Sequence, residues 1–129
     1  QQAERILLAD DNKPNQMLVV RLLERRGYRV DVVAGGSEAL AALAQQHYDL
    51  LFLDCFMPDM NGFETARRIR SSEPSGQRIP IIALTANVLP EDRQKCLNSG
   101  MDDCLAKPIN REDLFAALAR WLPNPQGSL

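Results

Sequence analysis

The chain has 129 residues and a formal net charge of −2 at pH 7, and 45% of its residues are hydrophobic and 25% are charged. This length suits one domain around one hydrophobic core, and the nearly balanced charge gives no reason to expect nucleic acid or a membrane surface as a direct partner. No apolar run approaches the roughly 18 residues that span a bilayer, so we expect one cytoplasmic domain. The three cysteines show neither CxxC spacing nor an obvious pairing, so we expect their thiols to be reduced.

Five short apolar runs alternate with five amphipathic segments along the chain. We interpret the runs as strands and the segments as helices. The expected strands are 5–9, 29–33, 49–53, 80–84 and 103–106, and the expected helices are 14–26, 37–46, one that starts near 62, 90–99 and one that begins after Asn110. We expect these elements to form one domain, 1–122, which is followed by a polar tail or linker, 123–129.

The strict alternation of strands and helices predicts an α/β fold in which helices cover both faces of a parallel sheet. Near-continuous apolarity in three strands is typical of strands that are buried on both faces, whereas the alternating run 29–33 indicates an edge strand. Right-handed crossovers permit few strand orders. The leading candidate is a doubly wound, five-stranded, flavodoxin-like sheet with the order 2-1-3-4-5.

Polar residues follow most of the predicted strands directly. Asp10 and Asp11 follow the first strand, Asp54 follows the third, Thr85 follows the fourth and Lys107 follows the fifth. In an open parallel sheet, ligands bind at the carboxyl ends of the strands, near the point where the strand order reverses. We therefore expect three carboxylates, a hydroxyl and an ammonium group to converge at one edge of the sheet.

Carboxylates gathered in this way need a counter-charge. Two like charges about 4 Å apart repel by roughly 4 kcal/mol at an effective dielectric constant near 20, so either one carboxylate is protonated or a cation holds them. Neither histidine nor cysteine ligands are expected beside these oxygens, which favours Mg²⁺ or Mn²⁺ over Zn²⁺. Each residue alone has an ordinary explanation as a helix cap, a turn hydroxyl or a surface lysine. Their joint placement favours a clamp around Asp54 that suits in-line attack by a carboxylate on a phosphoryl group.

Four motifs carry a resemblance to a known family. They are LLADDN at 7–12, DLLFLDCFMPDMNGFE at 49–64, IPIIALTAN at 79–87 and GMDDCLAKPI at 100–109. With these motifs the chain resembles, from about residue 5 to residue 122, the response-regulator receiver domain, which is the phosphoacceptor module of two-component signalling. In finer detail it is most similar to the receivers of hybrid sensor histidine kinases.

The resemblance implies a role for each acidic residue. It identifies Asp54 as the phosphoacceptor. It also implies a Mg²⁺ site in which Asp11 and Asp54 bind the ion through their side chains, Phe56 through its backbone carbonyl oxygen, and Asp10 mainly through a bound water molecule.

The same resemblance implies which groups hold the phosphoryl group. Lys107 is expected to pair with Asp54 and then with the phosphoryl oxygens. The Thr85 hydroxyl and the backbone N–H of Ala86 are expected to donate to those oxygens. The peptide bond between Lys107 and Pro108 is expected to be cis.

The resemblance also implies partners and a place in the cell. The phosphoryl group would come from a phosphohistidine of a histidine kinase or a histidine phosphotransfer domain, and it would be lost slowly after a change of conformation. The domain would be an acceptor rather than a turnover enzyme, although a full-length parent could be a hybrid histidine kinase. It would then be either a free-standing cytoplasmic regulator or the cytoplasmic part of a membrane-bound sensor kinase.

Two positions depart from the usual pattern of the family or vary within it. Cys104 occupies the position, three residues before the lysine, where most members have an aromatic residue that moves inward with the threonine, so we expect weak coupling to an output. Phe56 and Asn87 lie two residues after the acceptor and the threonine, where they flank the expected path of hydrolytic water. The bulky Phe56 therefore predicts a long-lived phosphoaspartate.

Two other functions remain open from the residues. An unphosphorylated pseudo-receiver would keep the fold and serve as a docking module. A Mg²⁺-dependent phosphatase of the haloacid dehalogenase type would require a second aspartate at the position of Phe56. Outside the site, Cys55 is expected to be a packing residue, and the charged stretch 67–78 is expected to be a solvated surface.

Overall fold

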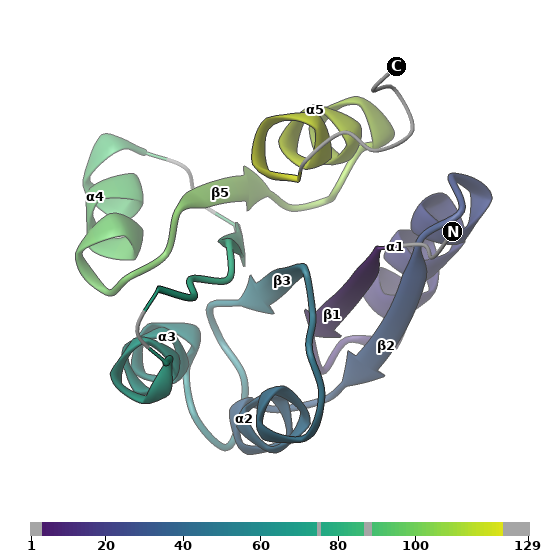
Figure 1. Ribbon diagram of the computed structural model, residues 1–129. Helices are drawn as coiled ribbons and strands as arrows, with labels where there is room; N and C mark the ends of the chain where they lie inside the picture. The colour runs from purple at the N-terminus through teal and green to yellow at the C-terminus, as the bar shows by residue number, and fades with distance from the viewer. Residues whose placement is uncertain (1–3, 75, 87–88, 123–129) are drawn as a thin grey trace.

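The computed structural model describes residues 4–74, 76–86 and 89–122. Five parallel strands form its central sheet (Figure 1), in the hydrogen-bonded order β2-β1-β3-β4-β5. The strands are β1 (Arg5–Ala9), β2 (Arg29–Val33), β3 (Leu50–Asp54), β4 (Ile81–Thr85) and β5 (Asp103–Ala106). The predicted α/β fold and its 2-1-3-4-5 strand order are confirmed.

Five helices cover the two faces of this sheet. They are α1 (Lys13–Arg25), α2 (Gly36–Gln45), α3 (Gly62–Ser72), α4 (Pro90–Asn98) and α5 (Arg111–Trp121). Helices α1 and α5 cover one face, and α2, α3 and α4 cover the other (Figure 1), so the core consists of two separate apolar clusters, one on each side of the sheet. Among the described residues, none of these helices is long and apolar enough to cross a membrane.

Burial along the strands follows their apolar pattern. Every residue of β3 and β4 is buried, whereas β2, at one edge of the sheet, has no fully buried residue. β3 and β4 also end one residue later than predicted, because Asp54 pairs with Leu84 across the two strands and the N–H of Cys55 donates to the Leu84 carbonyl at 3.1 Å. Asp54 and Thr85 are therefore the last residues of their strands, where the ladder restricts their backbones.

Asparagine side chains start three of the helices. The Oδ1 atoms of Asn12, Asn61 and Asn110 each accept the backbone N–H of the residue three positions later, at 2.8–2.9 Å. Such caps satisfy N–H groups that have no partner inside the helix. They place the start of α1, α3 and α5 immediately after the loops at the carboxyl ends of β1, β3 and β5, and so they also hold the loops that carry the polar residues.

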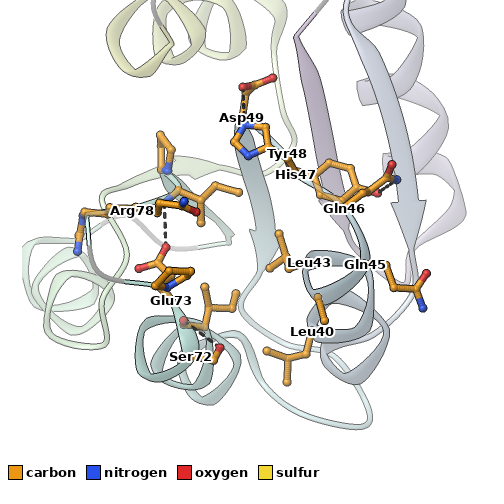
Figure 2. Close-up of a pocket in the computed structure, with 16 residues that line it drawn as sticks. Leu40, Leu43, Gln45, Gln46, His47, Tyr48, Asp49, Ser72, Glu73 and Arg78 are labelled. Carbon is orange, nitrogen blue, oxygen red and sulfur yellow. Dashed lines mark hydrogen bonds and ion pairs between the residues drawn. The ribbon is translucent and has the colours of Figure 1, made fainter.

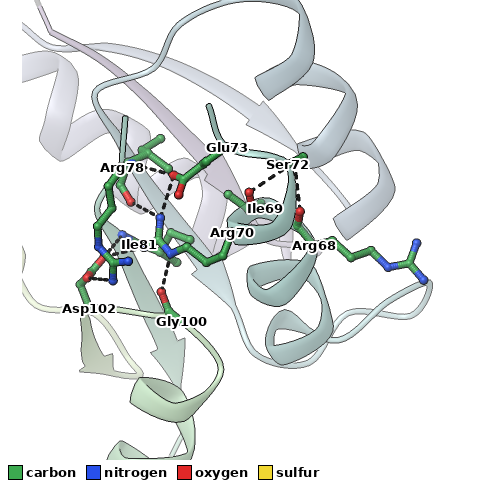
Figure 3. A network of polar contacts seen from close by, with 10 residues as sticks. Arg68, Ile69, Arg70, Ser72, Glu73, Arg78, Ile81, Gly100 and Asp102 are labelled. Carbon is green, nitrogen blue, oxygen red and sulfur yellow. Dashed lines mark hydrogen bonds and ion pairs between the residues drawn. The ribbon is translucent and has the colours of Figure 1, made fainter. Parts of the chain in front are cut away.

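The charged stretch 67–78 is only partly solvated, so the expectation for it is wrong in part. The Arg67 and Arg68 side chains are exposed, as expected. The Arg70 side chain is only 14% exposed, because its guanidinium lies at the centre of a polar network (Figure 3). The sequence pattern did not distinguish these arginines, since all three belong to one charged helix end.

The Arg70 network joins three segments that are distant in sequence. Its guanidinium donates to Glu73 Oε2, to Asp102 Oδ2 and to the carbonyl oxygens of Ile79 and Gly100, each at 2.8 Å (Figure 3). Burial lowers the pKa of this arginine, and the two carboxylates oppose that effect. The end of α3 is thereby tied to the segments that lead into β4 and β5.

Candidate functional site

Three carboxylates meet at the carboxyl edge of the sheet, where the strand order reverses between β1 and β3. Asp10 and Asp11 follow β1, and Asp54 ends β3. One carboxylate oxygen from each lies within 4.8 Å of the others. Asp10 and Asp54 are buried, whereas Asp11 is exposed. The predicted convergence of the three acids is confirmed, and Asp11 opens the cluster to solvent.

Lys107 brings a positive charge to this cluster. Its Nζ atom lies 3.1 Å from Asp54 Oδ1 and 3.9 Å from Asp10 Oδ2. Its backbone N–H donates to the Thr85 carbonyl at 2.8 Å, and the peptide bond between Lys107 and Pro108 is cis, as predicted. One ammonium group opposes three carboxylates here, so the cluster keeps an excess of negative charge.

Burial and neighbouring charges act on Asp10 in opposite directions. Burial raises the pKa of this carboxyl, and the Asp54 carboxylate raises it further. The backbone N–H of Asn12, which donates to Asp10 Oδ1 at 2.9 Å, lowers the pKa, as does the Lys107 ammonium. The pKa remains above its ordinary value, mainly because the carboxyl group is buried.

The chemistry of the donor set fits a hard divalent cation. All three side chains supply oxygen atoms, and one of the three is exposed, which leaves space for the water molecules that Mg²⁺ usually retains. A cation bound among these oxygens would supply the charge that Lys107 alone does not. The site residues therefore fit Mg²⁺ better than a softer metal.

Thr85 and Ala86 lie at the same edge, on the strand next to β3. Thr85 is buried at the end of β4, and Ala86 is exposed immediately after it. The backbone N–H of Phe56 donates to Asp54 Oδ1 at 3.2 Å, while the Phe56 side chain is 68% exposed beside Phe63 of α3. The structure thus places Thr85 and Ala86 at the same edge of the sheet as the acids, while Asn87 lies outside the described residues.

Comparison with known proteins shows which family the chain belongs to. Residues 6–119 match the family described as response regulator receiver domain. The chain belongs to this family. Its receiver fold and its motifs are therefore those of two-component signalling.

Relatives with similar sequences are parts of larger kinases. The chain is 42% identical over 125 residues to hybrid signal transduction histidine kinase L of Dictyostelium discoideum, and the match covers 93% of this chain and 7% of that protein. The first curated relatives that it matches are all much longer, and the chain spans 6–15% of their lengths.

Two solved receiver structures show the same fold. One is the receiver domain of sensor histidine kinase PA1611 from Pseudomonas aeruginosa, which has a magnesium ion coordinated in its active site cleft. It is 45% identical to this chain, with a TM-score of 0.83, and the match covers 92% of this chain and 97% of that one. The other is the structure of the Ssk1 receiver domain of Saccharomyces cerevisiae with the histidine phosphotransfer protein Ypd1. The match has 28% identity and a TM-score of 0.87, and it covers 96% of this chain and 92% of that one.

The loop that follows Asp54, 55–61, depends on a close approach between its end and β3. The N–H of Gly62 donates to the Cys55 carbonyl at 2.8 Å. A Cβ atom at Gly62 would lie 2.5 Å from the Asp54 carbonyl oxygen, which is closer than real Cβ atoms come. Only glycine therefore lets α3 begin directly against the end of β3.

Asp59 anchors this loop, and we did not predict it from the sequence. Its carboxylate accepts the backbone N–H groups of Gly36 and Ser37, each at 3.0 Å, at the start of α2. A Cβ atom at Gly35 would come within 2.7 Å of Asp59 Oδ1, so glycine at that position permits the contact. Hydrogen bonds from Ser37 and Gly36 lower the pKa of Asp59. Asp59 thus caps α2 and ties that helix to the loop that follows Asp54.

Replacing Asp59 with alanine is expected to destabilise the receiver by about 1 kcal/mol at pH 7, as loss of a helix cap usually does. Because the folded state lowers the pKa, this stabilisation is present above the ordinary pKa of 3.8 and is lost as the pH falls through the lower folded value. Urea unfolding between pH 7 and pH 3 should show the gap between parent and variant closing in acid. Asp59→Asn, which keeps a neutral acceptor, should show a smaller and flatter gap, and a constant gap for Asp59→Ala would contradict the cap.

A cavity in the described part of the receiver lies at the opposite edge of the sheet. It has a volume of about 800 Å³ and lies between the ends of α2 and α3 (Figure 2). Leu40 and Leu43 form part of its apolar wall, and His47, Asp49 and Arg78 line it with polar groups. Since β3 and β4 start at this edge, the cavity is separated from the acidic cluster by the length of the strands.

Proposed function

We propose that this receiver takes a phosphoryl group from a phosphohistidine onto Asp54, in a reaction that depends on Mg²⁺. The observation that carries the proposal is the cluster itself, in which a buried carboxylate is paired with Lys107 at 3.1 Å and lies within 4.8 Å of two further carboxylates. Buried carboxylates gathered in this way are costly to the fold unless a cation is bound. A site for phosphoryl transfer explains that cost.

In the proposed step, a carboxylate oxygen of Asp54 attacks the phosphorus atom in line, and the bond between phosphorus and the histidine nitrogen breaks. The electron pair of that bond leaves with the imidazole, and an acyl phosphate forms on Asp54. A bound Mg²⁺ would neutralise charge on the phosphoryl oxygens. Lys107, the Thr85 hydroxyl and the Ala86 N–H are proposed to donate to those oxygens. Thr85 ends β4, Ala86 follows it, and Lys107 follows β5 at the same edge of the sheet.

Each acid of the cluster has a separate proposed role toward the ion. The exposed Asp11 and the acceptor Asp54 would bind it through their side chains, with the backbone carbonyl of Phe56 as a third protein ligand. Asp10 is fully buried and already accepts the N–H of Asn12, which supports an indirect contact through water. Mn²⁺ shares the preference of Mg²⁺ for oxygen ligands and would occupy the same place.

The proposed phosphoryl donor is a histidine kinase or a histidine phosphotransfer domain. The structure of the Ssk1 receiver with Ypd1 supports a phosphotransfer protein as one class of partner. The small share of the curated relatives that the chain spans supports a hybrid histidine kinase as the parent protein, with the receiver on its cytoplasmic side. Residues 1–122 would form the receiver and 123–129 a tail or linker, which lies outside the described residues.

Cys104 limits how the proposed phosphorylation would be transmitted. Moving a two-state element from 1:99 to 99:1 requires about 5.5 kcal/mol of differential binding. Cys104 is buried in β5, and its Sγ atom accepts a hydrogen bond from the Arg93 guanidinium of α4 at 3.4 Å. This position is therefore already tied to α4, and its side chain is too small to fill the space of an aromatic ring. We infer that the response is weak around β5 and travels mainly through α4.

Incubation with acetyl phosphate tests the proposed function directly. With Mg²⁺ present, intact-mass spectrometry should show one phosphoryl group per chain, and removal of the ion with EDTA should abolish the adduct. No adduct with or without Mg²⁺ would favour the pseudo-receiver. Steady release of phosphate without an accumulated adduct would favour a phosphatase, which the apolar Phe56 at the position of its second aspartate argues against.

Phe56→Asn is expected to shorten the lifetime of the phosphorylated receiver about tenfold, which corresponds to ~1.4 kcal/mol of activation free energy. The exposed ring of Phe56 follows the acceptor by two residues and should hinder the approach of water, whereas an amide should admit it. Loss of the adduct with time after removal of acetyl phosphate measures the effect. Leu97→Asn, at an exposed apolar residue of α4, is the matched control and should leave the lifetime unchanged. An unchanged lifetime for Phe56→Asn would refute the role of the ring.

A further inference from the structure

All three cysteines of the chain lie in the same half of the core. Cys55 directly follows the acceptor, Cys96 lies in α4 and Cys104 lies in β5. All are free thiols, all are buried, and all belong to the apolar cluster on the face of the sheet that α2, α3 and α4 cover. Cys55 and Cys104, which are 49 positions apart in sequence, thus lie in the same apolar cluster.

Two of the three thiols are direct neighbours. The Cys55 and Cys96 side chains share a hydrogen bond. Cys104 pairs with Ala83 of β4, which pairs with Leu53 of β3, so two strand spacings separate it from the strand that leads to Cys55. At about 4.8 Å per spacing, that separation exceeds the ~7 Å between Cα atoms that a disulfide tolerates. The sheet therefore excludes a bridge between Cys55 and Cys104.

Helix α4 is weakly attached to the sheet, and Cys96 is its main attachment. Among the nine residues of α4, Cys96 is the buried one. Side chains of α4 also contact the sheet and α3. Arg93 forms an ion pair with Asp103 at 3.1 Å and donates to Cys104 Sγ at 3.4 Å, and the Lys95 ammonium lies 4.7 Å from the ring of Phe63. A helix with so little buried apolar surface opens locally at low cost. Such an opening exposes the Cys96 thiol to small solutes.

We propose that Cys55 and Cys96 form an oxidisable thiol pair, a modification site at which a peroxide produces an intramolecular disulfide. The proposal rests on the shared hydrogen bond, the burial of both thiols in one apolar cluster, and the weak attachment of α4. It concerns a reaction at sulfur and does not depend on the proposed phosphoryl transfer.

The places of the two thiols give them different roles. Cys96 lies on α4, whose local opening exposes it to peroxide, whereas Cys55 directly follows β3 in the core. The Cys96 thiolate attacks one oxygen of hydrogen peroxide, the O–O bond breaks, and the departing hydroxide takes up a proton to give water and a sulfenic acid. The Cys55 sulfur then attacks the Cys96 sulfur, the S–O bond breaks, and the second hydroxide leaves as water with the Cys55 proton. Two thiols and one peroxide thus give one disulfide and two water molecules.

The bridge would join α4 covalently to the residue beside Asp54. It would close a long loop, because the two cysteines are separated by α3 and β4. A closed loop of this length stabilises mainly by restricting the unfolded chain. The oxidised chain should therefore melt at a higher temperature than the reduced chain, by about 5 °C or more.

The test uses the reduced 129-residue chain, freed of reductant and exposed to hydrogen peroxide at pH 7. It is then denatured with N-ethylmaleimide and weighed. The expected product has lost two hydrogens and carries one maleimide, on Cys104, and digestion should yield a linked peptide that contains Cys55 and Cys96. The matched control Cys104→Ser should form the same bridge and carry no maleimide.

Four outcomes would overturn the proposal. They are three maleimides after peroxide treatment, an oxygen adduct without loss of two hydrogens, a bridge that includes Cys104, and a bridge between two chains. Cys55→Ser and Cys96→Ser should each form no intramolecular bridge. The parent chain alone carries the decisive readout, so a variant that folds poorly does not affect the result, and acetyl phosphate uptake by the reduced chain is scored separately.

Discussion

Asp54→Asn is expected to reduce phosphoryl uptake from acetyl phosphate to less than ~1% of the parent's, because an amide is not a nucleophile of the kind that the step requires. The substitution also removes one of three neighbouring carboxylates, so the folded state should be at least as stable as the parent's. Loss of uptake would then report the missing nucleophile and not unfolding. Intact-mass spectrometry with Mg²⁺ and acetyl phosphate measures uptake, and urea unfolding measures stability.

Asp49→Asn is the matched control for this variant. Asp49 lies just before β3, at the opposite end of the strand that Asp54 ends, and its carboxylate accepts the backbone N–H of Arg5 at 2.8 Å. The side-chain oxygen of an asparagine can still accept this hydrogen bond. The control should therefore take up one phosphoryl group at the parent's rate. Uptake by Asp54→Asn, or its loss in Asp49→Asn, would remove Asp54 from the role proposed for it.

Arg70→Ala is expected to lower the free energy of unfolding by about 2–4 kcal/mol. Its side chain is 14% exposed, and its guanidinium donates hydrogen bonds to two carboxylates and two backbone carbonyls. Removal of one partner from a largely buried ion pair leaves the other charge without compensation. Glu73, which is also largely buried, would be left in that state, whereas Asp102 would keep its ion pair with Arg78 at 2.6 Å.

Arg68→Ala is the matched control on the same helix. Its side chain is 58% exposed and pairs with Glu64 in the next turn, so its removal should cost no more than about 0.5 kcal/mol. Urea unfolding of the two variants, side by side, measures the difference. Similar costs for both would show that the Arg70 network contributes no more than a surface ion pair.

Local patterns were sufficient to predict the fold. The alternation of apolar runs with helical stripes gave all five strands and all five helices, with boundaries that differ by about one residue, and the alternating pattern of β2 indicated its place at an edge. Capping by Asn110 could also be read locally, because an N-cap interacts with a residue only three positions later. Each of these signals lies within a few residues of the feature that it predicts.

The main residues of the site were predictable for a related reason. Parallel strands bring their carboxyl ends to one edge, so Asp10, Asp11, Asp54, Thr85 and Lys107 could be placed together from the ends of their strands. The distances could not be predicted in the same way. That Lys107 lies closer to Asp54 than to Asp10, and that Asp11 alone is exposed, depends on how the loops pack.

By itself, the sequence determined the layered fold, the strand order and the meeting of acids and lysine at one edge, because these follow from periodicity and from the geometry common to all parallel sheets. Only the tertiary structure decided which charged residues are buried and which loops are tied together. Arg70 and Asp102 are 32 positions apart, and Asp59 and Gly36 are 23 apart. Such contacts leave no periodic or local signal, since they depend on the packing of segments whose separation in sequence has no fixed relation to their distance in space.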